Sequence, residues 1–352
     1  MSPSATAAGA DAVAPSALET VRRTARRRRA VVVVATVVLV AVISLVALSM
    51  GDYPLTVEQV WHALWGGGTR AEAYVVFQVR APRLVMALIA GAALGIAGAL
   101  LQSLLGNPLA SPDLLGISGG SGAAAIFALL VLGMSGPSLA LAAFVGGMVV
   151  AGLLLLAGRA QTDGGYRLIL AGVGMSFLAG AATSLLMVRA QVEQAQMAML
   201  WLTGSLSSTP WWQVATVAVV FALVIPAVVA AARWLPIVQL GASTASGLGV
   251  RPGLVRVVTV TAAVILTAVT CAFLGPISFV ALCAPAIARP LLGHASAGIA
   301  TSGLIGAALL TTADLVAQYA IPGMSVPVGV VTGAIGALFL LWLLATSKGR
   351  QL

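Results

Sequence analysis

Charged residues are scarce in this sequence. Asp, Glu, Lys and Arg make up 8% of the 352 residues, whereas soluble domains carry about 25%. Hydrophobic residues make up 60%, so the chain has too little polar surface to coat a soluble globule of this size. A bilayer core about 30 Å thick needs about 20 apolar residues per helix, and such segments follow one another almost end to end. The composition leaves little room for a soluble domain and predicts an all-α integral membrane protein.

Cysteine and lysine are also rare. The two cysteines, Cys271 and Cys283, lie inside apolar segments, so neither a disulfide framework nor a metal-ligand spacing is indicated. The only lysine, Lys348, precedes Gly349, which excludes a phosphate loop ending in Lys-Ser or Lys-Thr. The net charge of +9 does not indicate nucleic acid, because the arginines gather at the ends of apolar segments, where they report membrane orientation. We expect no catalytic residue, metal site or cofactor in this chain, and no nucleic-acid partner.

The N-terminus joins a basic segment to the first apolar run. Residues 1–29 are rich in Ala, Ser and Pro and end in six arginines, and the apolar run 30–50 follows directly. A signal peptide has an apolar region of about 7–15 residues, and this run is longer. We therefore expect a disordered basic tail over 1–29 in the cytoplasm and an uncleaved first transmembrane helix.

Nine further apolar segments follow, approximately over residues 83–105, 114–134, 138–157, 168–190, 211–232, 256–275, 277–292, 297–320 and 327–346. An even number of spans beginning inside returns the C-terminus to the cytoplasm. Fourteen of the 18 basic residues are then cytoplasmic, as the excess of Lys and Arg in cytoplasmic loops requires. The sequence thus predicts about ten transmembrane helices over 30–346, a cytoplasmic loop over 233–255 and a cytoplasmic tail over 347–352.

Small residues line one face of several predicted helices. The spacing of four, three and four residues places Gly91, Gly95, Gly98 and Gln102 on one stripe. Similar faces contain Gly172 and Ser176, and Gly329 and Gly333. Such faces either let helix backbones pack closely in lipid or line a weakly polar transport pathway, and the sequence leaves both open.

Acidic residues inside the predicted membrane segments are few. Asp314 is the clearest case, and Arg189 and Glu193 lie near an outer end. A proton-coupled pump commonly has a relay of Asp, Glu and His residues across the membrane. The sequence shows no such relay, which argues against that class.

A series of short motifs runs through the chain from residue 80 to residue 332. In order they are Arg80-Ala81-Pro82-Arg83; Gly91-Ala92-Ala93-Leu94 with Gln102; Asn107-Pro108-Leu109-Ala110 with Pro112 and Leu115-Gly116; Leu170-Ala171-Gly172-Val173; Trp201-Leu202-Thr203-Gly204-Ser205 with Trp211; Leu240-Gly241 with Ala245 and Leu248-Gly249-Val250; Gly275-Pro276-Ile277-Ser278-Phe279-Val280; Ala284-Pro285-Ala286-Ile287-Ala288-Arg289; Ala313-Asp314; and Pro327-Val328-Gly329 with Val331-Thr332. In this order and at these spacings they resemble the permease family of iron-siderophore, haem and vitamin B12 ABC importers.

The resemblance implies a vitamin B12 importer permease-like fold of ten helices in a bacterial cytoplasmic membrane. It implies a dimer of permease chains with the pathway between them, two ATPase subunits that bind ATP and Mg, and an extracytoplasmic substrate-binding protein. The implied cargo is a metal chelate, most often a ferric siderophore. An ion- or proton-coupled secondary transporter is the alternative class, and a membrane structural or channel protein is a third.

The resemblance also implies roles for individual residues. Arg80 and Arg83 match arginines that meet acidic residues of the binding protein, although they also suit simple anchoring at the lipid headgroups. Two positions depart from the family pattern: Gln318 stands where a third arginine is usual, and Ala286 replaces a histidine. Both departures favour a heterodimer with a second permease chain over a symmetric homodimer.

Two cytoplasmic regions complete the expected sites. The cytoplasmic gate is matched by Asn107, Leu109, Gly165 and Tyr166. The ATPase-coupling segment is matched by Leu240, Gly241, Ala245, Gly247, Leu248, Gly249 and Val250, for which a solvated connecting loop is the plainer interpretation.

Overall fold

The protein is described here by a computed structural model that covers residues 14–157, 166–293, 298–321 and 324–347. Over these ranges the chain forms helices joined by turns, and the described part contains no β-sheet. Ten helices correspond to the predicted spans: α1 (Ala14–Ser49), α4 (Ala81–Leu105), α5 (Ile117–Leu130), α6 (Pro137–Ala157), α7 (Tyr166–Arg189), α9 (Trp211–Val238), α11 (Pro252–Leu274), α12 (Val280–Leu292), α13 (Ile299–Tyr319) and α14 (Val328–Ser347).

Seven of these ten helices contain candidate membrane-spanning stretches, and α5, α12 and α14 contribute shorter apolar ones. The remaining helices are short and lie between the spans: α2 (Val57–Leu64), α3 (Arg70–Tyr74), the π-helix η1 (Val75–Arg80), α8 (Val192–Leu202) and α10 (Ala242–Gly247). The all-α, ten-span expectation is confirmed.

The structure differs from the predicted boundaries at three places. Helix α1 begins at Ala14, so residues 14–29 are helical instead of disordered, because Ala and Arg are strong helix formers. The cytoplasmic loop is shorter than 233–255, because α9 continues to Val238 and keeps Leu235 in the core. Helix α5 begins only at Ile117, after a series of turns that starts at Asn107.

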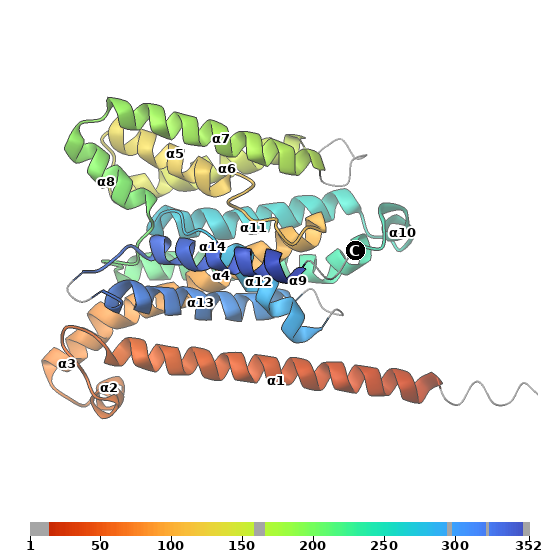
Figure 1. Ribbon diagram of the computed structural model, residues 1–352, viewed down its shortest axis with the longest axis horizontal. Coiled ribbons are helices and arrows are strands. Elements are labelled where there is room, and N and C mark those ends of the chain that lie inside the picture. The colour runs from red at the N-terminus through yellow and green to blue at the C-terminus, as the bar shows by residue number, and fades with distance from the viewer. Residues whose placement is uncertain (1–13, 158–165, 294–297, 322–323, 348–352) are drawn as a thin grey trace, which may run out of the picture.

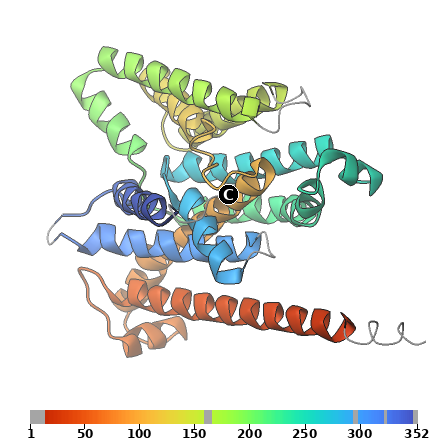
Figure 2. The same cartoon turned by 45° about the vertical axis from the view of Figure 1, so that its right-hand side comes forward.

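The spans run antiparallel and collect the connecting helices at two ends (Figure 1). Helices α2, α3 and α8 lie at one end, whereas α10 and the start of α1 lie at the other. Turning the molecule shows α1 along one flank and α5–α8 along the opposite flank (Figure 2). Most described arginines lie at the α10 end, which identifies it as the cytoplasmic end.

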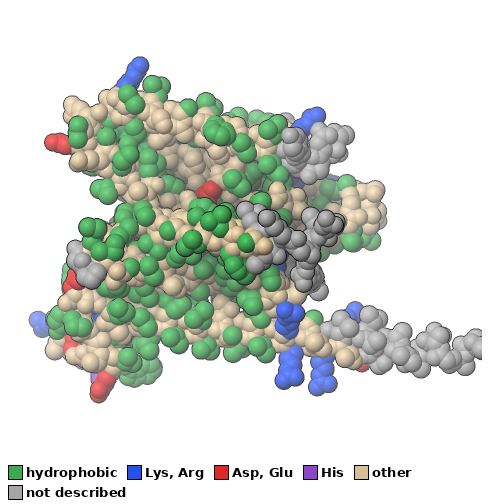
Figure 3. Space-filling view, in the orientation of Figure 1, with side chains coloured by type: hydrophobic (Ala, Val, Ile, Leu, Met, Phe, Trp, Pro, Cys, Tyr) green, Lys and Arg blue, Asp and Glu red, His purple; other side chains and the backbone are tan. Residues whose placement is uncertain are grey.

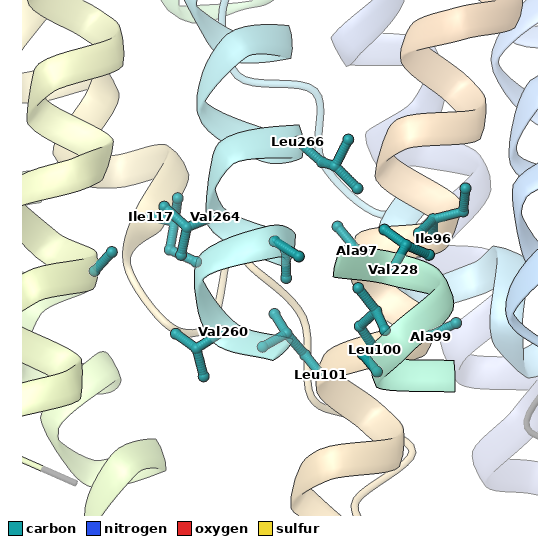
Figure 4. Packing of buried hydrophobic residues seen from close by; sticks show 14 of the residues in the cluster. Ile96, Ala97, Ala99, Leu100, Leu101, Ile117, Val228, Val260, Val264 and Leu266 are labelled. Atoms are coloured by element: carbon teal, nitrogen blue, oxygen red, sulfur yellow. The ribbon is translucent and has the colours of Figure 1, made fainter. Parts of the chain in front are cut away.

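Helix α4 occupies the centre of the bundle and packs against α9, α11, α12 and α13. Its buried residues and those of α11 form most of the principal hydrophobic cluster. Figure 4 shows part of this cluster: Leu266 of α11 points toward α4, which carries Ile96 and Ala97, whereas Val264 lies on the other side of α11 beside Ile117. Lipid tails are as apolar as these side chains, so close packing, more than water exclusion, holds the helices together.

Candidate functional site

The outer end of the molecule contains a polar hollow of about 680 Å³. Its wall combines the end of α1, the turn that follows, η1, the start of α4, the loop before α9 and the end of α13. The charged residues that line it are Asp52, Arg80, Arg83 and Asp314. The structure thus brings both predicted docking arginines into one hollow, together with two acids.

Arg83 forms an ion pair with Asp314. Its Nε donates to Asp314 Oδ2 at 2.9 Å and its Nη2 to Oδ1 at 2.8 Å, which is the strong bidentate geometry of arginine with a carboxylate. The side chain of Asp314 is 7% exposed and that of Arg83 is 23% exposed. A lone carboxylate at such a site is costly, so Arg83 stabilises Asp314 and ties α4 to α13. The charge of Arg83 is therefore compensated within the chain.

Arg80 has neutral hydrogen-bond partners. Its Nη1 donates to the carbonyl oxygens of Leu48 at 2.6 Å and Ser49 at 3.2 Å, and its Nη2 donates to that of Tyr53. These bonds satisfy carbonyls at the end of α1, which lack partners inside the helix. These carbonyl groups carry no net charge, so Arg80 has no bidentate ion pair like that of Arg83, although Asp52 of the same hollow attracts its guanidinium. The sequence motif gives Arg80 and Arg83 the same expected role, but the structure gives them partners of different charge.

Gln318 completes the network around Asp314. Its Nε2 donates to Asp314 Oδ2 at 2.8 Å, and the Tyr319 hydroxyl lies 3.2 Å from Gln318 Oε1 and 3.1 Å from the carbonyl oxygen of Met50. The one positive charge of Arg83 already compensates the one negative charge of Asp314. Because Gln318 is neutral, the group of these three residues has no net charge, whereas an arginine at position 318 would make it positive.

The small-residue stripe of α4 is a packing surface. A Cβ atom added to Gly91, Gly95 or Gly98 would overlap the carbonyl oxygens of Gly306, Ser302 and Ala281, respectively. Gln102 at the end of the stripe donates from Nε2 to the carbonyl oxygen of Leu282 at 3.2 Å. Helices α12 and α13 thus approach the α4 backbone directly, which is the packing interpretation for this stripe.

The other small-residue faces are only partly covered. Gly172 packs against Leu115, and Ser176 donates from its hydroxyl to the carbonyl oxygen of Gly172 at 3.0 Å. Gly329 lies against the carbonyl oxygen of Thr203. By contrast, an added Cβ at Gly333 on α14 would have no heavy atom within 4 Å, so this part of α14 presents an open face.

The structure describes three of the four residues that were predicted to form the cytoplasmic gate. The side chain of Asn107 accepts a hydrogen bond from the Leu109 N–H at 2.9 Å, which is typical of an Asx turn. Leu109 is exposed and lines a cavity of about 280 Å³ together with Phe279 and Leu340. Tyr166 is the first residue of α7, and Gly165 lies outside the described residues.

Asp113, which the sequence reasoning missed, lines the same cavity as Leu109. Its carboxylate accepts hydrogen bonds from the Ser118 hydroxyl and from the backbone N–H of Phe279. Phe279 has a φ of 68° and is the N-cap residue of α12, whose N-terminus favours a negative charge. Asp113 therefore joins the turns after α4 to the start of α12. Asp113 could have been found from the sequence by the criterion that drew attention to Asp314, because it too is an acidic residue in an otherwise apolar stretch.

The predicted coupling segment forms a short helix, α10, at the cytoplasmic end. Ala245 is buried against the rest of the chain, whereas Leu240 and Leu248 on either side of α10 are 66% and 64% exposed. An added Cβ at Gly247 or Gly249 would have no heavy atom within 4 Å. The structure therefore shows an anchored helix flanked by two uncovered leucines, with open space beside its glycines.

No group of three or more His, Cys, Asp or Glu residues in the described part of the chain is placed to hold a metal ion.

Comparison with known proteins relates this arrangement to a transport family. The model of the FecCD transport family matches residues 38–346. This chain belongs to the FecCD transport family. The ferric enterobactin permease protein FepG of Escherichia coli is 39% identical over 311 residues, with 88% of this chain and 94% of FepG covered. The Fe(3+) dicitrate permease protein FecD of Escherichia coli is 38% identical, with 87% and 95% covered.

A more distant FecCD-type relative and a solved structure agree with this assignment. The hemin permease protein HmuU of Yersinia pestis is 29% identical, with 89% of this chain and 95% of HmuU covered. An inward-facing structure assigned to the metal-chelate type of ABC transporter has a TM-score of 0.80 and 27% identity, and covers 89% of this chain and 98% of its own. The fold and the multi-pass location in a bacterial cytoplasmic membrane are those of the FecCD family.

The structure gives a reason for one of the two residues that depart from the FecCD pattern, Gln318, but not for the other, Ala286. Gln318 takes part in the Asp314 network, as described above. Ala286 lies in α12, three residues before Arg289, whose Nη2 donates to the Ser103 hydroxyl at 3.2 Å. Nothing in the structure explains why alanine stands at position 286.

Proposed function

We propose that this chain is the permease subunit of an ATP-driven importer of a metal chelate, with a ferric siderophore as the first cargo to test. The observation that carries the proposal is the FecCD family match over residues 38–346. This chain aligns with almost the whole length of relatives that are named as permeases for ferric enterobactin, ferric citrate and hemin. These names differ in cargo but agree on transport of an iron compound.

The chain itself makes and breaks no bonds in this proposal. ATP and Mg bind to two separate ATPase subunits, because the sequence contains no phosphate loop. The uncovered Leu240 and Leu248 beside α10 suit a groove on such a subunit. ATP-driven closure of the ATPase pair would move α10, and thereby α9 and α11, which flank it in the chain.

The translocation pathway lies between this chain and a second permease chain. The exposed apolar residues of α7 and α14, among them Phe177, Val188 and Leu338, together with the open face at Gly333, support this placement. Heterodimer formation is favoured because Gln318 and Ala286 depart from the family pattern. In alternating access, cargo would enter from the outer end and leave past the turns that contain Leu109.

The binding protein docks on the outer end, and Arg80 supplies the charge that attracts it. Complementary charges govern encounter and register more than stability, and Arg83 is neutralised by Asp314. We expect Arg80→Gln, which keeps N–H donors for the α1 carbonyls, to weaken docking severalfold at low salt and little at high salt. The matched control is Arg70→Gln in the exposed part of α3. Equal docking by both variants at every salt concentration would remove Arg80 from the docking surface.

Uptake measurements test the proposal as a whole. A strain that lacks this chain should lose uptake of its radiolabelled ferric siderophore and regain it with the intact gene. Uptake should be blocked by vanadate and should require the ATPase that purifies with the chain. Uptake that continues without ATPase subunits and collapses with the proton gradient would establish a secondary transporter instead.

A further inference from the structure

An apolar groove lies between α1, α12, α13 and α14, apart from α10. Phe279 borders both this groove and the gate cavity, and Ala313 of its wall precedes Asp314 of the outer hollow. The volume of the groove is about 360 Å³, and its wall includes Leu39, Ile287, Leu291, Leu309 and Ile335. The hydroxyl of Thr36, which also lines it, is already bonded to the carbonyl oxygen of Val32 at 2.8 Å. The groove therefore offers apolar contacts along nearly its whole wall.

The groove runs from Leu291 near the cytoplasmic end of α12 to Ala313 in the outer half of α13. Its wall follows α12 from Val280 to Leu291, which is about 16 Å of helix at 1.5 Å per residue. One leaflet of the hydrocarbon core is about 15 Å thick, half of the full core. The groove thus has the length that one lipid acyl chain occupies in one leaflet.

A basic cluster stands at the cytoplasmic end of this groove. It consists of six exposed arginines of α1: Arg22, Arg23, Arg26, Arg27, Arg28 and Arg29. Figure 3 shows blue side chains gathered on this part of the molecule. The following stretch 30–49 is about 30 Å long as a helix and fills the core, so the cluster lies at the level of the cytoplasmic headgroups.

Arg28 connects the cluster to the groove. Its Nε donates to the carbonyl oxygen of Leu291 at 2.8 Å and its Nη2 to that of Pro290 at 2.9 Å. Leu291 itself lines the groove. The carbonyl partners are neutral, so the positive charge of Arg28 is retained within one residue of the apolar wall.

We infer that this groove and Arg28 at its cytoplasmic end form a binding site for a phospholipid with an anionic headgroup. One acyl chain lies along α12 and the phosphate contacts Arg28, whereas the other arginines of the cluster only raise the positive potential around the site. Basic pockets between transmembrane helices on the cytoplasmic side recognise anionic headgroups by the same combination of charge and apolar contact. A protein segment would suit the apolar wall equally, but it would leave the adjacent positive charges without an anion at headgroup depth.

The chain offers two matched pairs of variants for a test. Leu39→Trp fills the groove, whereas Val38→Trp at the same depth faces away from it; the two native side chains are 51% and 56% exposed. Arg28→Gln removes the charge that is bonded to the carbonyl groups of Pro290 and Leu291, whereas Arg27→Gln removes the charge of a neighbouring arginine that is also exposed. The full-length chain, purified with its co-purifying transporter subunits, is exchanged into detergent with phosphatidylglycerol or phosphatidylcholine. Native mass spectrometry counts the lipids retained.

We expect wild type, Val38→Trp and Arg27→Gln to retain phosphatidylglycerol in preference to phosphatidylcholine. Leu39→Trp should lose the retained lipid. Arg28→Gln should weaken phosphatidylglycerol binding about fivefold, the equivalent of about 1 kcal/mol for one basic residue at an anionic surface.

Equal retention of both lipids by wild type, or equal behaviour within both variant pairs, would overturn the inference. A loss of a protein subunit with Leu39→Trp at unchanged lipid retention would also overturn it, because the groove would then be a protein interface.

Discussion

The ion pair between Arg83 and Asp314 predicts an asymmetric response to truncation. Replacing Arg83 by Ala leaves a carboxylate that is 7% exposed, with Gln318 as its remaining side-chain donor. Breaking a buried pair in this way costs about 3–5 kcal/mol. Replacing Asp314 by Ala instead leaves Arg83, whose side chain is 23% exposed and borders the outer hollow. Water can reach this guanidinium, so the cost should fall to about 1–2 kcal/mol.

The double variant gives the decisive comparison. Arg83→Ala with Asp314→Ala contains neither charge, so it should be at least as stable as Arg83→Ala alone, because no uncompensated carboxylate remains. All three variants can be followed by detergent-induced unfolding with tryptophan fluorescence as the signal. Arg70→Ala, an exposed arginine at the same end of the molecule, serves as the control and should change stability by less than about 0.5 kcal/mol.

Two results would refute this reasoning. If the two single variants lose equal stability and their effects add in the double variant, the pair is not coupled in the way the structure shows. If Arg83→Ala behaves like Arg70→Ala, Asp314 is solvated or has another partner. The docking role of Arg83 would then be open again.

The remaining predictions concern topology, coupling and packing. Reporter fusions should place both ends of the chain in the cytoplasm, and an external signal at either end would contradict the ten-span arrangement. Gly247→Leu should lower ATPase association or uncouple hydrolysis from uptake, because a Cβ atom added at Gly247 has no heavy atom of this chain within 4 Å and the longer side chain would project toward a partner subunit. Gly152→Leu, which also has open space, is its control, and normal coupling in both would exclude α10 as the coupling element. Gly98→Ala should lower the stability by about 3 kcal/mol through overpacking against Ala281, whereas Gly180→Ala, with no neighbour within 4 Å, should unfold as wild type does.

Several features could be read from the sequence without the fold. Hydropathy identified each of the ten spans, because a helix in lipid must present apolar side chains over about 20 residues. The arginines assigned the orientation, and the ordered motifs pointed to a transport family that the comparisons then confirmed. Helix ends were less certain. Residues 14–29 were expected to be disordered, because charge density is visible in a sequence but the continuation of a helix beyond the membrane is not.

Other features depended on which helices are neighbours. A stripe such as Gly91 to Gly98 is a packing surface only because the backbones of α12 and α13 lie against it, and the similar face at Gly333 remains open. The same limitation affected Asp113, whose partner Phe279 lies far along the chain. Local spacing gives the face of a helix on which a residue lies, but not the helix that faces it.

The sequence by itself indicated a ten-span membrane protein of a known transport family and predicted that both ends lie in the cytoplasm, because hydropathy, arginine position and motif order are properties of the linear chain. Only the tertiary structure decided that Arg83 forms an ion pair with a buried carboxylate, whereas Arg80 is hydrogen-bonded to carbonyl groups. Asp314 lies 231 residues from Arg83 in sequence and 2.8 Å from it in space. The charge of a side chain is compensated by an opposite charge on a neighbouring helix, and helix packing decides which residues become neighbours.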